Sequence, residues 1–445
     1  MRAGTLLFSL LVFLNLGCGL NHSVRVINLK CENLINPLGI DKTFPRFSWE
    51  ITSSGQGAEQ KAYQLMVASS PSLLEKDQAD LWNSGMVSSS ESLFVPYGGI
   101  PLRSGSAACW KVRIWDEKGE VSPWSQMAEF SIGLLNTKDW HASYIGFPTK
   151  AGFRECPQLK KTFRLKETGN RWLLHVNSLG YHEVWLNGKK AGDGVLVPAV
   201  SQFGKRSLSV TYDVSDQVKQ GENNLVIWLG SGWYTYGLPG VTHDGPLVKA
   251  QLESISDLGR ELILVTDSTW LGRVSSYTRE GNWRPHRFGG ETVDGSLSKS
   301  DLAFGDIPGR IWSPVSTVAV PEHEVSPQMV EMNQIIETIK PLEIRSLSKD
   351  TLLIDMGKNL TGWFEIYFPK LQKSQVIQMD YCDHLDDKGC FVEQKQSDRY
   401  IASGEKGEHF INRFNYHGFR YIRISNLTST PDLSAVSAHL IHTGY

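Results

Sequence analysis

Short runs in which apolar and polar residues alternate recur along the chain after its first twenty residues. In the first part such runs occupy Arg46–Ile51, Ala62–Val67 and Cys109–Trp115, and a tight turn is expected at Asp116–Gly119. Alternation with a period of two places every second side chain on the same face, so each run predicts a half-buried strand. Strands at this spacing, rich in tryptophan, indicate a fibronectin III-like or immunoglobulin-like sandwich over residues 23–135.

A second all-β region is predicted over residues 139–321. Its clearest candidate strands are Trp172–Val176, His182–Leu186 and Asn224–Leu229. Asn187 and Gly188 directly follow the second of these strands, and both residue types tolerate the positive φ angles of a type I′ turn. A β-hairpin is therefore predicted at this point.

A third all-β region is predicted over residues 322–445. Its candidate strands are Thr351–Asp355, Phe364–Phe368, Val376–Asp380, Tyr421–Ile424 and Ala438–Ile441. After the first twenty residues, no helical pattern longer than about ten residues occurs, and no repeat of fixed period is present. The fold class is predicted to be all-β, with several sandwich domains in series.

The first twenty residues have the composition of a signal peptide. Arg2 supplies a basic end, and Leu6–Leu16 is an apolar run too short to span the roughly 30 Å hydrocarbon core of a bilayer. Export is therefore expected, to the periplasm, the outer membrane as a lipoprotein, or the exterior. Cys18 lies where a bacterial lipoprotein cysteine would be lipidated, although Leu16 replaces the usual small residue. Lipidation at Cys18 and simple cleavage nearby both stay open.

Length, charge and cysteine content exclude several classes of protein. A chain of 445 residues is expected to form two to four domains. Its formal charge is −2, without a run of basic residues, so no nucleic-acid partner is expected. The cysteines beyond Cys18 are widely spaced and lack the pattern of a disulfide framework or a zinc site. Cys382 and Cys390 could form a hairpin bridge or remain two half-buried thiols.

The motifs of the common enzyme classes are absent from the sequence. There is no Gly-x-Ser-x-Gly elbow, His-Glu-x-x-His pair, phosphate-binding loop or dinucleotide fingerprint. A glycosidase is not excluded, because it needs only two carboxyl groups flanking a sugar, and sequence spacing does not reveal such pairs. The densest acidic cluster comprises Asp380, Asp383, Asp386 and Asp387. It predicts either a hairpin loop capped by aspartates or a calcium site.

Two aromatic segments could contact a carbohydrate. The segment Gly230–Tyr234 contains two glycines followed by Trp233 and Tyr234. These two aromatic side chains could form a platform for a sugar ring or an aromatic plug at the end of a sandwich. Tyr416–Tyr421 could clamp a sugar. Alternatively, Phe419 and Tyr421 pack into a core while Arg420 pairs with an acid.

Glu32–Asp41 followed by Pro45–Trp49 is similar to the opening of the bacterial α-L-rhamnosidases of glycoside hydrolase family 78. Further similar segments follow in the family's order, at Leu81–Gly85, Ser122–Ser125, Leu179–Tyr181, Leu186–Lys189, Gly192–Asp193, Thr211–Val214, Gly232–Tyr234, Asp355–Asn359, Gly362–Trp363 and Tyr416–Tyr421. Because these segments are collinear over roughly residues 25–445, the resemblance covers almost the whole chain.

This resemblance implies a fibronectin III-like or immunoglobulin-like sandwich followed by jelly-roll β-sandwich domains. In the family an (α/α)6 barrel carrying the catalytic glutamates follows these β domains, and nothing in this sequence matches its motif. No catalytic residue is therefore assigned. Family jelly rolls can bind rhamnose with a calcium ion, which implies a binding set of Asn187, Asp193, Trp233 and Tyr234. Pro198–Ser201 departs from the family pattern there and lacks an aromatic residue.

Three hypotheses about function follow. The leading one is an α-L-rhamnosidase-like accessory half that recognises or presents a rhamnose-containing glycan and is inactive alone. It would be either a truncated gene product or the partner of a separately encoded catalytic barrel. The second is a self-sufficient α-L-rhamnosidase or other glycosidase with its carboxyl groups on the β domains. The third is a non-catalytic surface scaffold or adhesin held by the lipid anchor.

Overall fold

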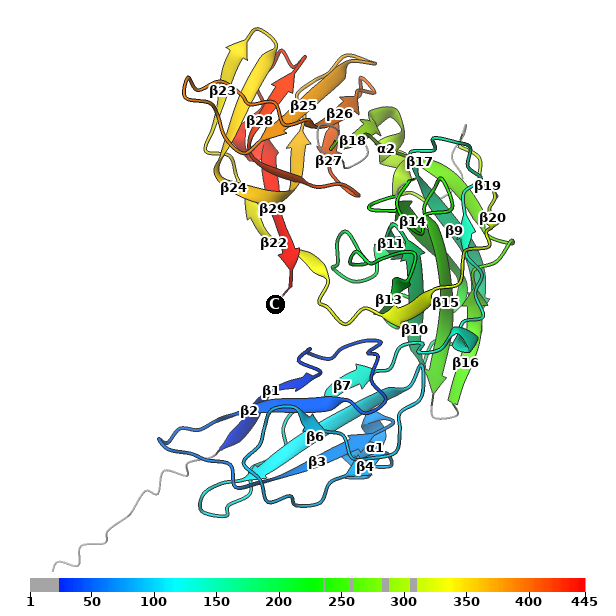
Figure 1. The fold of residues 1–445 in the computed structure, drawn as a ribbon, viewed down its shortest axis with the longest axis vertical. Helices are drawn as coiled ribbons and strands as arrows, with labels where there is room; N and C mark the ends of the chain where they lie inside the picture. The colour runs from blue at the N-terminus through cyan, green and yellow to red at the C-terminus, as the bar shows by residue number, and fades with distance from the viewer. Residues whose placement is uncertain (1–23, 235–236, 257–258, 282–287, 305–309, 445) are drawn as a thin grey trace, which may run out of the picture. The chain divides into compact units, whose positions relative to one another are not determined.

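The computed structural model describes residues 24–234, 237–256, 259–281, 288–304 and 310–444, and its secondary structure is almost entirely β (Figure 1). The predicted signal peptide at residues 1–20, including Cys18, lies outside the described residues. No helix in the described ranges is long and apolar enough to cross a membrane. The chain divides into two compact units. Among the described residues, the first comprises 24–35, 46–99 and 109–128, and the second comprises the others.

The first unit is a β-sandwich of the predicted kind. One sheet has the order β1 (Arg25–Cys31), β2 (Arg46–Thr52), β5 (Val95–Pro96). The other has the order β4 (Trp82–Asn83), β3 (Ala62–Ala68), β6 (Ala107–Trp115), β7 (Ala128–Ser131), with a short helix α1 (Pro71–Glu75) after β3. Phe47 and Trp110 pack in its core with ring centroids 4.4 Å apart. The Nε1–H of buried Trp49 donates to Gln60 Oε1 at 2.9 Å. These tryptophans serve the core, as their alternating pattern indicates.

The second unit begins with a jelly-roll-type sandwich of two facing sheets. One sheet has the order β20 (Ser316–Thr317), β8 (Ile145–Gly146), β15 (Leu247–Ser256), β10 (Arg171–Leu179), β13 (Arg206–Asp213), β21 (Glu324–Pro327), with β16 (Gly259–Val265) beside β15. The other sheet starts with β12 (Lys189–Lys190), β11 (Tyr181–Leu186), β14 (Gly221–Gly230), β9 (Glu155–Leu165), β17 (Leu271–Arg279), with β19 (Ser313–Pro314) beside β17. Apolar side chains from both sheets, among them Trp172, Leu174, Ile227 and Trp270, form the core between them.

The second of these sheets continues into the C-terminal region (Figure 1). Its order goes on through β18 (Glu291–Asp294), β26 (Gln396–Ile401), β25 (Val376–Cys382), β28 (His417–Ser425), β24 (Thr351–Tyr367), β29 (Val436–Thr443), β22 (Asn333–Ile339), with β23 (Glu343–Ser348) and β27 (His409–Ile411) on β24. A seven-residue helix, α2 (Gly295–Asp301), follows β18, and short 3-10 turns lie at η1 (Thr137–Asp139) and η2 (Leu433–Ala435). β18 and β26 pair in parallel, so main-chain hydrogen bonds cross from the predicted second region to the third.

One predicted pair of strands is a single long strand. The sequence predicts separate strands at Thr351–Asp355 and Phe364–Phe368, whereas β24 runs through both. Its pairing with β28 shifts register between Asp355 and Leu360. Gly357 lies there with a φ of +78°, a conformation that most residues avoid. The irregularity is therefore a bulge within one strand, which turns Asn359–Thr361 toward a hollow in the surface.

Candidate functional site

Asn187 holds the turn of its hairpin. It has a φ of +53° and Gly188 a φ of +82°, as the predicted type I′ turn requires, and β11 and β12 pair on either side of them. The Asn187 amide donates to Gln217 O and to Asn223 Oδ1, both at 2.8 Å, and Asn187 Oδ1 accepts from the Asn224 main-chain N–H at 3.0 Å. Both ends of the amide are engaged by protein, so Asn187 acts here as a structural residue.

We expect Asn187→Ala to lower the free energy of unfolding by about 1–3 kcal/mol, because it leaves partly buried partners unsatisfied and replaces asparagine, which tolerates positive φ, by a residue that does not. Urea unfolding measures this change. Lys189→Ala, at an exposed position in the same hairpin, is the control and should change the free energy by less than about 0.5 kcal/mol. An Asn187→Ala protein of unchanged stability would show that the three hydrogen bonds contribute nothing.

Trp233 and Tyr234 are neighbours in sequence but pack into different clusters. Tyr234 is 1% exposed beside Tyr144 and Leu179, and its ring contacts Phe203 edge to face at 5.3 Å. A sugar cannot stack on a ring that is covered in this way, so Tyr234 forms the aromatic plug and not the platform. Trp233 is half-buried against the C-terminal core, and its side chain hydrogen-bonds to the Tyr181 and Tyr416 hydroxyls.

Asp193 lies in the loop after β12 and is exposed. Nothing in the described part of the chain pairs with its carboxylate, and nearby Lys190 instead pairs with Glu183 at 3.5 Å. Of the four residues in the predicted binding set, Asp193 and Trp233 therefore retain side-chain surface that a ligand could reach. Their role in binding stays a prediction.

The aromatic segment Tyr416–Tyr421 contributes to the core and to an ion pair. Phe419 is fully buried, and Arg420 forms a two-pronged ion pair with Asp355, at 2.8 Å from Nε and 3.0 Å from a terminal nitrogen. Hydrogen bonding by Arg420 lowers the pKa of the Asp355 carboxyl. Tyr421 is half-buried with the Arg420 guanidinium 4.9 Å from its ring. The core-packing alternative is confirmed for Phe419 and Arg420.

The acidic cluster forms a capped turn. Asp386 Oδ1 accepts the main-chain N–H groups of Lys388 and Cys390 at 2.9 and 2.7 Å, and Gly389 has a φ of +74°. No group of three or more His, Cys, Asp or Glu in the described ranges is arranged to hold a metal ion. Cys382 and Cys390 are both free thiols, the first buried and the second exposed. The hairpin loop is thus confirmed, and calcium binding stays a prediction.

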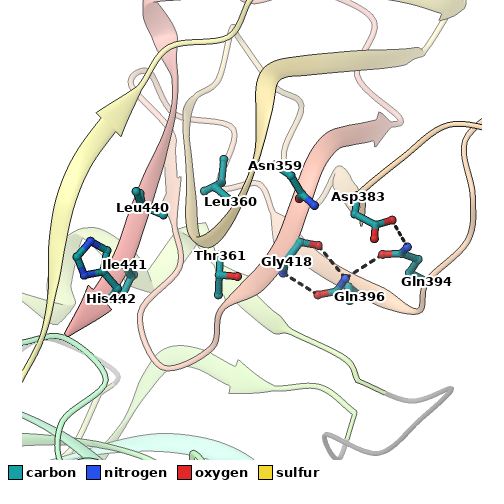
Figure 2. A pocket seen from close by; sticks show the side chains of 10 residues that line it. All are labelled: Asn359, Leu360, Thr361, Asp383, Gln394, Gln396, Gly418, Leu440, Ile441 and His442. Carbon is teal, nitrogen blue, oxygen red and sulfur yellow. Dashed lines mark hydrogen bonds between the residues drawn. The ribbon is translucent and has the colours of Figure 1, made fainter.

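An open pocket of about 590 Å³ lies beside this loop, on the C-terminal β region (Figure 2). That volume falls within the roughly 300–1,000 Å³ typical of small-molecule sites. The lining residues come from the bulge of β24, the loop after β25, β26, β28 and the end of β29. They are Asn359, Leu360, Thr361, Asp383, Gln394, Gln396, Gly418, Leu440, Ile441 and His442. We take this pocket as the candidate functional site.

A chain of hydrogen bonds fixes one wall of the pocket (Figure 2). The Gln396 amide pairs with both main-chain groups of Gly418, donating to O and accepting from N at 3.0 Å each. Gln396 Nε2 also donates to Gln394 Oε1 at 3.3 Å, and Gln394 Nε2 donates in turn to Asp383 Oδ1. The Gln394 and Gln396 amides thus connect the Asp383 carboxylate to the main chain of Gly418, and this network holds the carboxylate in a defined orientation.

Asp383 carries negative charge into the pocket at neutral pH. A hydrogen bond from His384 Nδ1 to Asp383 Oδ1, at 2.5 Å, is the main cause that lowers the pKa of this carboxyl, and the Gln394 amide adds to it. None of the lining residues is Lys or Arg. The pocket therefore offers acceptors and amides but no fixed positive charge.

Sequence reasoning missed most of this wall. Asp383 was found as part of an acidic cluster, and Asn359 only as part of a family-like segment. Gln394, Gln396 and Thr361 carry no signal in a single sequence, because amides and hydroxyls are common on any exposed strand.

A second cluster of polar side chains is completely buried where β18 meets β26. Glu291 is 1% exposed and accepts the main-chain N–H groups of Arg413 and Phe414 at 2.8 Å. Asp398 is fully buried and accepts from Glu291 N, the Tyr381 hydroxyl, Asn412 Nδ2 and His417 Nε2 at 2.6, 2.6, 2.7 and 3.0 Å. Burial and the neighbouring Asp398 raise the pKa of Glu291 to about 8. Substrate cannot reach either carboxyl group, so the cluster is structural.

Three regions of the chain are similar to known protein families. Three family models match in order: the Rha78A-like N-terminal immunoglobulin domain over residues 26–136, the alpha-L-rhamnosidase N-terminal domain over residues 168–337, and the bacterial alpha-L-rhamnosidase concanavalin-like domain over residues 345–442. The third match contains the open pocket.

Individual relatives and solved structures that resemble the chain are also alpha-L-rhamnosidases. An alpha-L-rhamnosidase of Formosa agariphila is 28% identical over 100% of this chain and 51% of its own length, and one of Alteromonas sp. is 28% identical over 93% and 46%. The alpha-L-rhamnosidase structure from Dictyoglumus thermophilum superposes with a TM-score of 0.84 at 29% identity, over 94% of this chain and 49% of that one. The Aspergillus terreus enzyme, at 24% identity and a TM-score of 0.80 over 95% and 49%, shares the fold.

The chain spans about half the length of the relatives that it matches. The similarity extends along nearly the whole chain. The three family models match one after another, and the superposition covers 94% of the chain. The chain therefore consists of β domains of the bacterial α-L-rhamnosidase family, the family that its sequence motifs resemble.

Proposed function

We propose that this chain is the glycan-recognition half of a rhamnoside-cleaving glycoside hydrolase and does not cleave rhamnosides alone. The observation that carries the proposal is the ordered match of three rhamnosidase β domains over residues 26–136, 168–337 and 345–442. Its partners would be a rhamnose-containing glycan and a separately encoded catalytic barrel. Export, with lipidation at Cys18, belongs to the same proposal.

The carboxyl groups of the described residues support a non-catalytic role. A glycosidase needs two carboxyl groups on either side of a bound sugar, about 5–10 Å apart and open to substrate. One pair of carboxyl groups that the fold brings together, Glu291 and Asp398, is buried among protein donors. Two other pairs, Asp380 with Glu393 and Glu129 with Asp213, are each neutralised by a shared arginine. In the pocket, Asp383 is the one carboxylate among the lining residues. A self-sufficient glycosidase would need a second one within reach.

The experiment is a calorimetric titration of the mature chain with L-rhamnose, with and without calcium, beside a release assay on an aryl α-L-rhamnoside. We expect saturable binding and no release of the aryl group. Release above the rate of the heat-denatured chain would contradict the proposal and favour a self-sufficient enzyme. Absence of both binding and release would favour a scaffold or adhesin.

A further inference from the structure

The open pocket has two unlike walls, and polar atoms on one of them lack protein partners. Asn359 and Thr361 project from the bulge of β24, and both are exposed. Neither side chain forms a hydrogen bond within the described ranges. Asp383 Oδ1 accepts from His384 and Gln394, whereas no other side chain among the described residues donates to its Oδ2. An amide, a hydroxyl and a carboxylate oxygen therefore remain available to a ligand.

Three apolar side chains also line the pocket. Leu440 and Ile441 come from β29, and Leu360 lies between Asn359 and Thr361 on the bulge. All three also belong to or pack against the C-terminal hydrophobic core, so their positions are fixed by packing. A ligand that suits both walls must present hydroxyl groups on one side and C–H groups on the other.

We propose that this pocket is a binding site for a neutral saccharide, in which Asn359, Thr361 and Asp383 bind hydroxyl groups and Leu440 and Ile441 contact the C–H face of the ring. This inference deepens the proposed function and rests on it for the choice of saccharides. It adds a site in the concanavalin-like region, apart from the jelly-roll residues that the sequence implied.

The charge and the polar groups of the pocket favour a neutral saccharide over an acidic sugar or a divalent cation. Asp383 is ionised, and apart from His442 no lining side chain can carry a positive charge, so a uronate or a sulfated sugar would be repelled by the Asp383 carboxylate. A hard divalent cation requires about six oxygen ligands, and one carboxylate oxygen with an amide and a hydroxyl does not provide them. A neutral polyol can use each of these groups singly.

The binding wall is preorganised. Gln396 is tied to the main chain at Gly418, and through Gln394 it sets the direction of the Asp383 carboxylate. Groups already held in place lose little freedom when a ligand binds. Because the pocket is open, a single sugar should still bind weakly, with a Kd on the order of millimolar.

The experiment measures saccharide binding to the whole mature chain by saturation-transfer NMR and calorimetry. The probes are methyl α-L-rhamnoside, methyl β-D-galactoside and sodium D-glucuronate. Thr361→Val removes a hydroxyl at nearly constant volume. Asp383→Asn replaces Oδ2 by an amide while keeping an oxygen for the Gln394 bond. Asp387→Asn, at an exposed position of the same loop, is the matched control. Thermal unfolding midpoints verify that each variant folds.

We expect a neutral glycoside to bind the wild type and the Asp387→Asn control alike, and Thr361→Val and Asp383→Asn at least five-fold more weakly. Asp383→Asn should also bind D-glucuronate better than the wild type does, because the repelling charge is gone.

Each other result is decisive. If the rhamnoside binds equally to all four proteins, the pocket is not the saccharide-binding site, whereas the proposed function still holds. Asp383-dependent binding of the galactoside but not the rhamnoside would support the pocket and contradict rhamnose recognition. No binding of either neutral glycoside to the wild type would overturn both.

Discussion

Replacing Asp398 by alanine should lower the free energy of unfolding by about 3–5 kcal/mol. The carboxylate is fully buried and accepts four hydrogen bonds, from Glu291 N, the Tyr381 hydroxyl, Asn412 Nδ2 and His417 Nε2. Alanine removes every acceptor at once and leaves donors buried without partners, each costing about 1–3 kcal/mol before the site relaxes. Urea unfolding followed by tryptophan fluorescence measures the loss.

The same substitution at an exposed site provides the control. Asp387→Ala lies in the neighbouring loop and should change the free energy of unfolding by less than about 0.5 kcal/mol. Hydrogen exchange locates the effect of Asp398→Ala, because the amides of β18 and β26, whose pairing this cluster supports, should lose protection first. An Asp398→Ala protein within 1 kcal/mol of the wild type would mean that the network contributes little.

The contribution of Glu291 to the free energy of unfolding should fall as the pH rises from about 5 to 8. Burial and the charge of Asp398 raise the pKa of Glu291 from 4.5 to about 8 in the folded protein. Between these values the folded chain holds a proton that the unfolded chain has released, so raising the pH favours unfolding. The contribution is complete below pH 4.5 and lost by about pH 8, with a slope of at most about 1.4 kcal/mol per pH unit.

The test compares the wild type with Glu291→Gln at pH 5, 6, 7 and 8. The glutamine amide cannot accept the N–H groups of both Arg413 and Phe414, so the variant is less stable by a constant amount at low pH. Its deficit relative to the wild type should shrink as the pH rises. Asp398 does not disturb this window, because its lowered pKa affects stability only as the pH falls below 3.8. Parallel curves for the two proteins would show that Glu291 is ionised throughout.

Local sequence patterns predicted the strands well. Arg46–Ile51 and Ala62–Val67 correspond almost residue for residue to β2 and β3, and Asn187–Gly188 forms the predicted hairpin turn. The reason is that period-two alternation and positive-φ turn residues act between near neighbours in sequence. β24 was predicted as two strands, because a bulge interrupts the alternation while the sheet pairing continues on both sides.

The candidate site was predictable only in part. Motif resemblance identified the family, and the acidic loop was noticed, but the binding set implied for the jelly roll included Asn187 and Tyr234. The first is engaged by the turn and the second is covered by Phe203. Whether a Tyr ring faces solvent or the core depends on residues distant in sequence, such as Leu179 and Leu247.

The sequence by itself determined the all-β class, most strands, the principal hairpin and the family, since each follows from local periodicity, turn chemistry or collinear motifs. Only the tertiary structure decided that Asp383, Gln394 and Asn359 share one pocket, and that Glu291 and Asp398 share one buried network. Both groupings join residues from strands far apart in the chain. Their register is set by sheet pairing and core packing across the whole unit, which no local pattern contains.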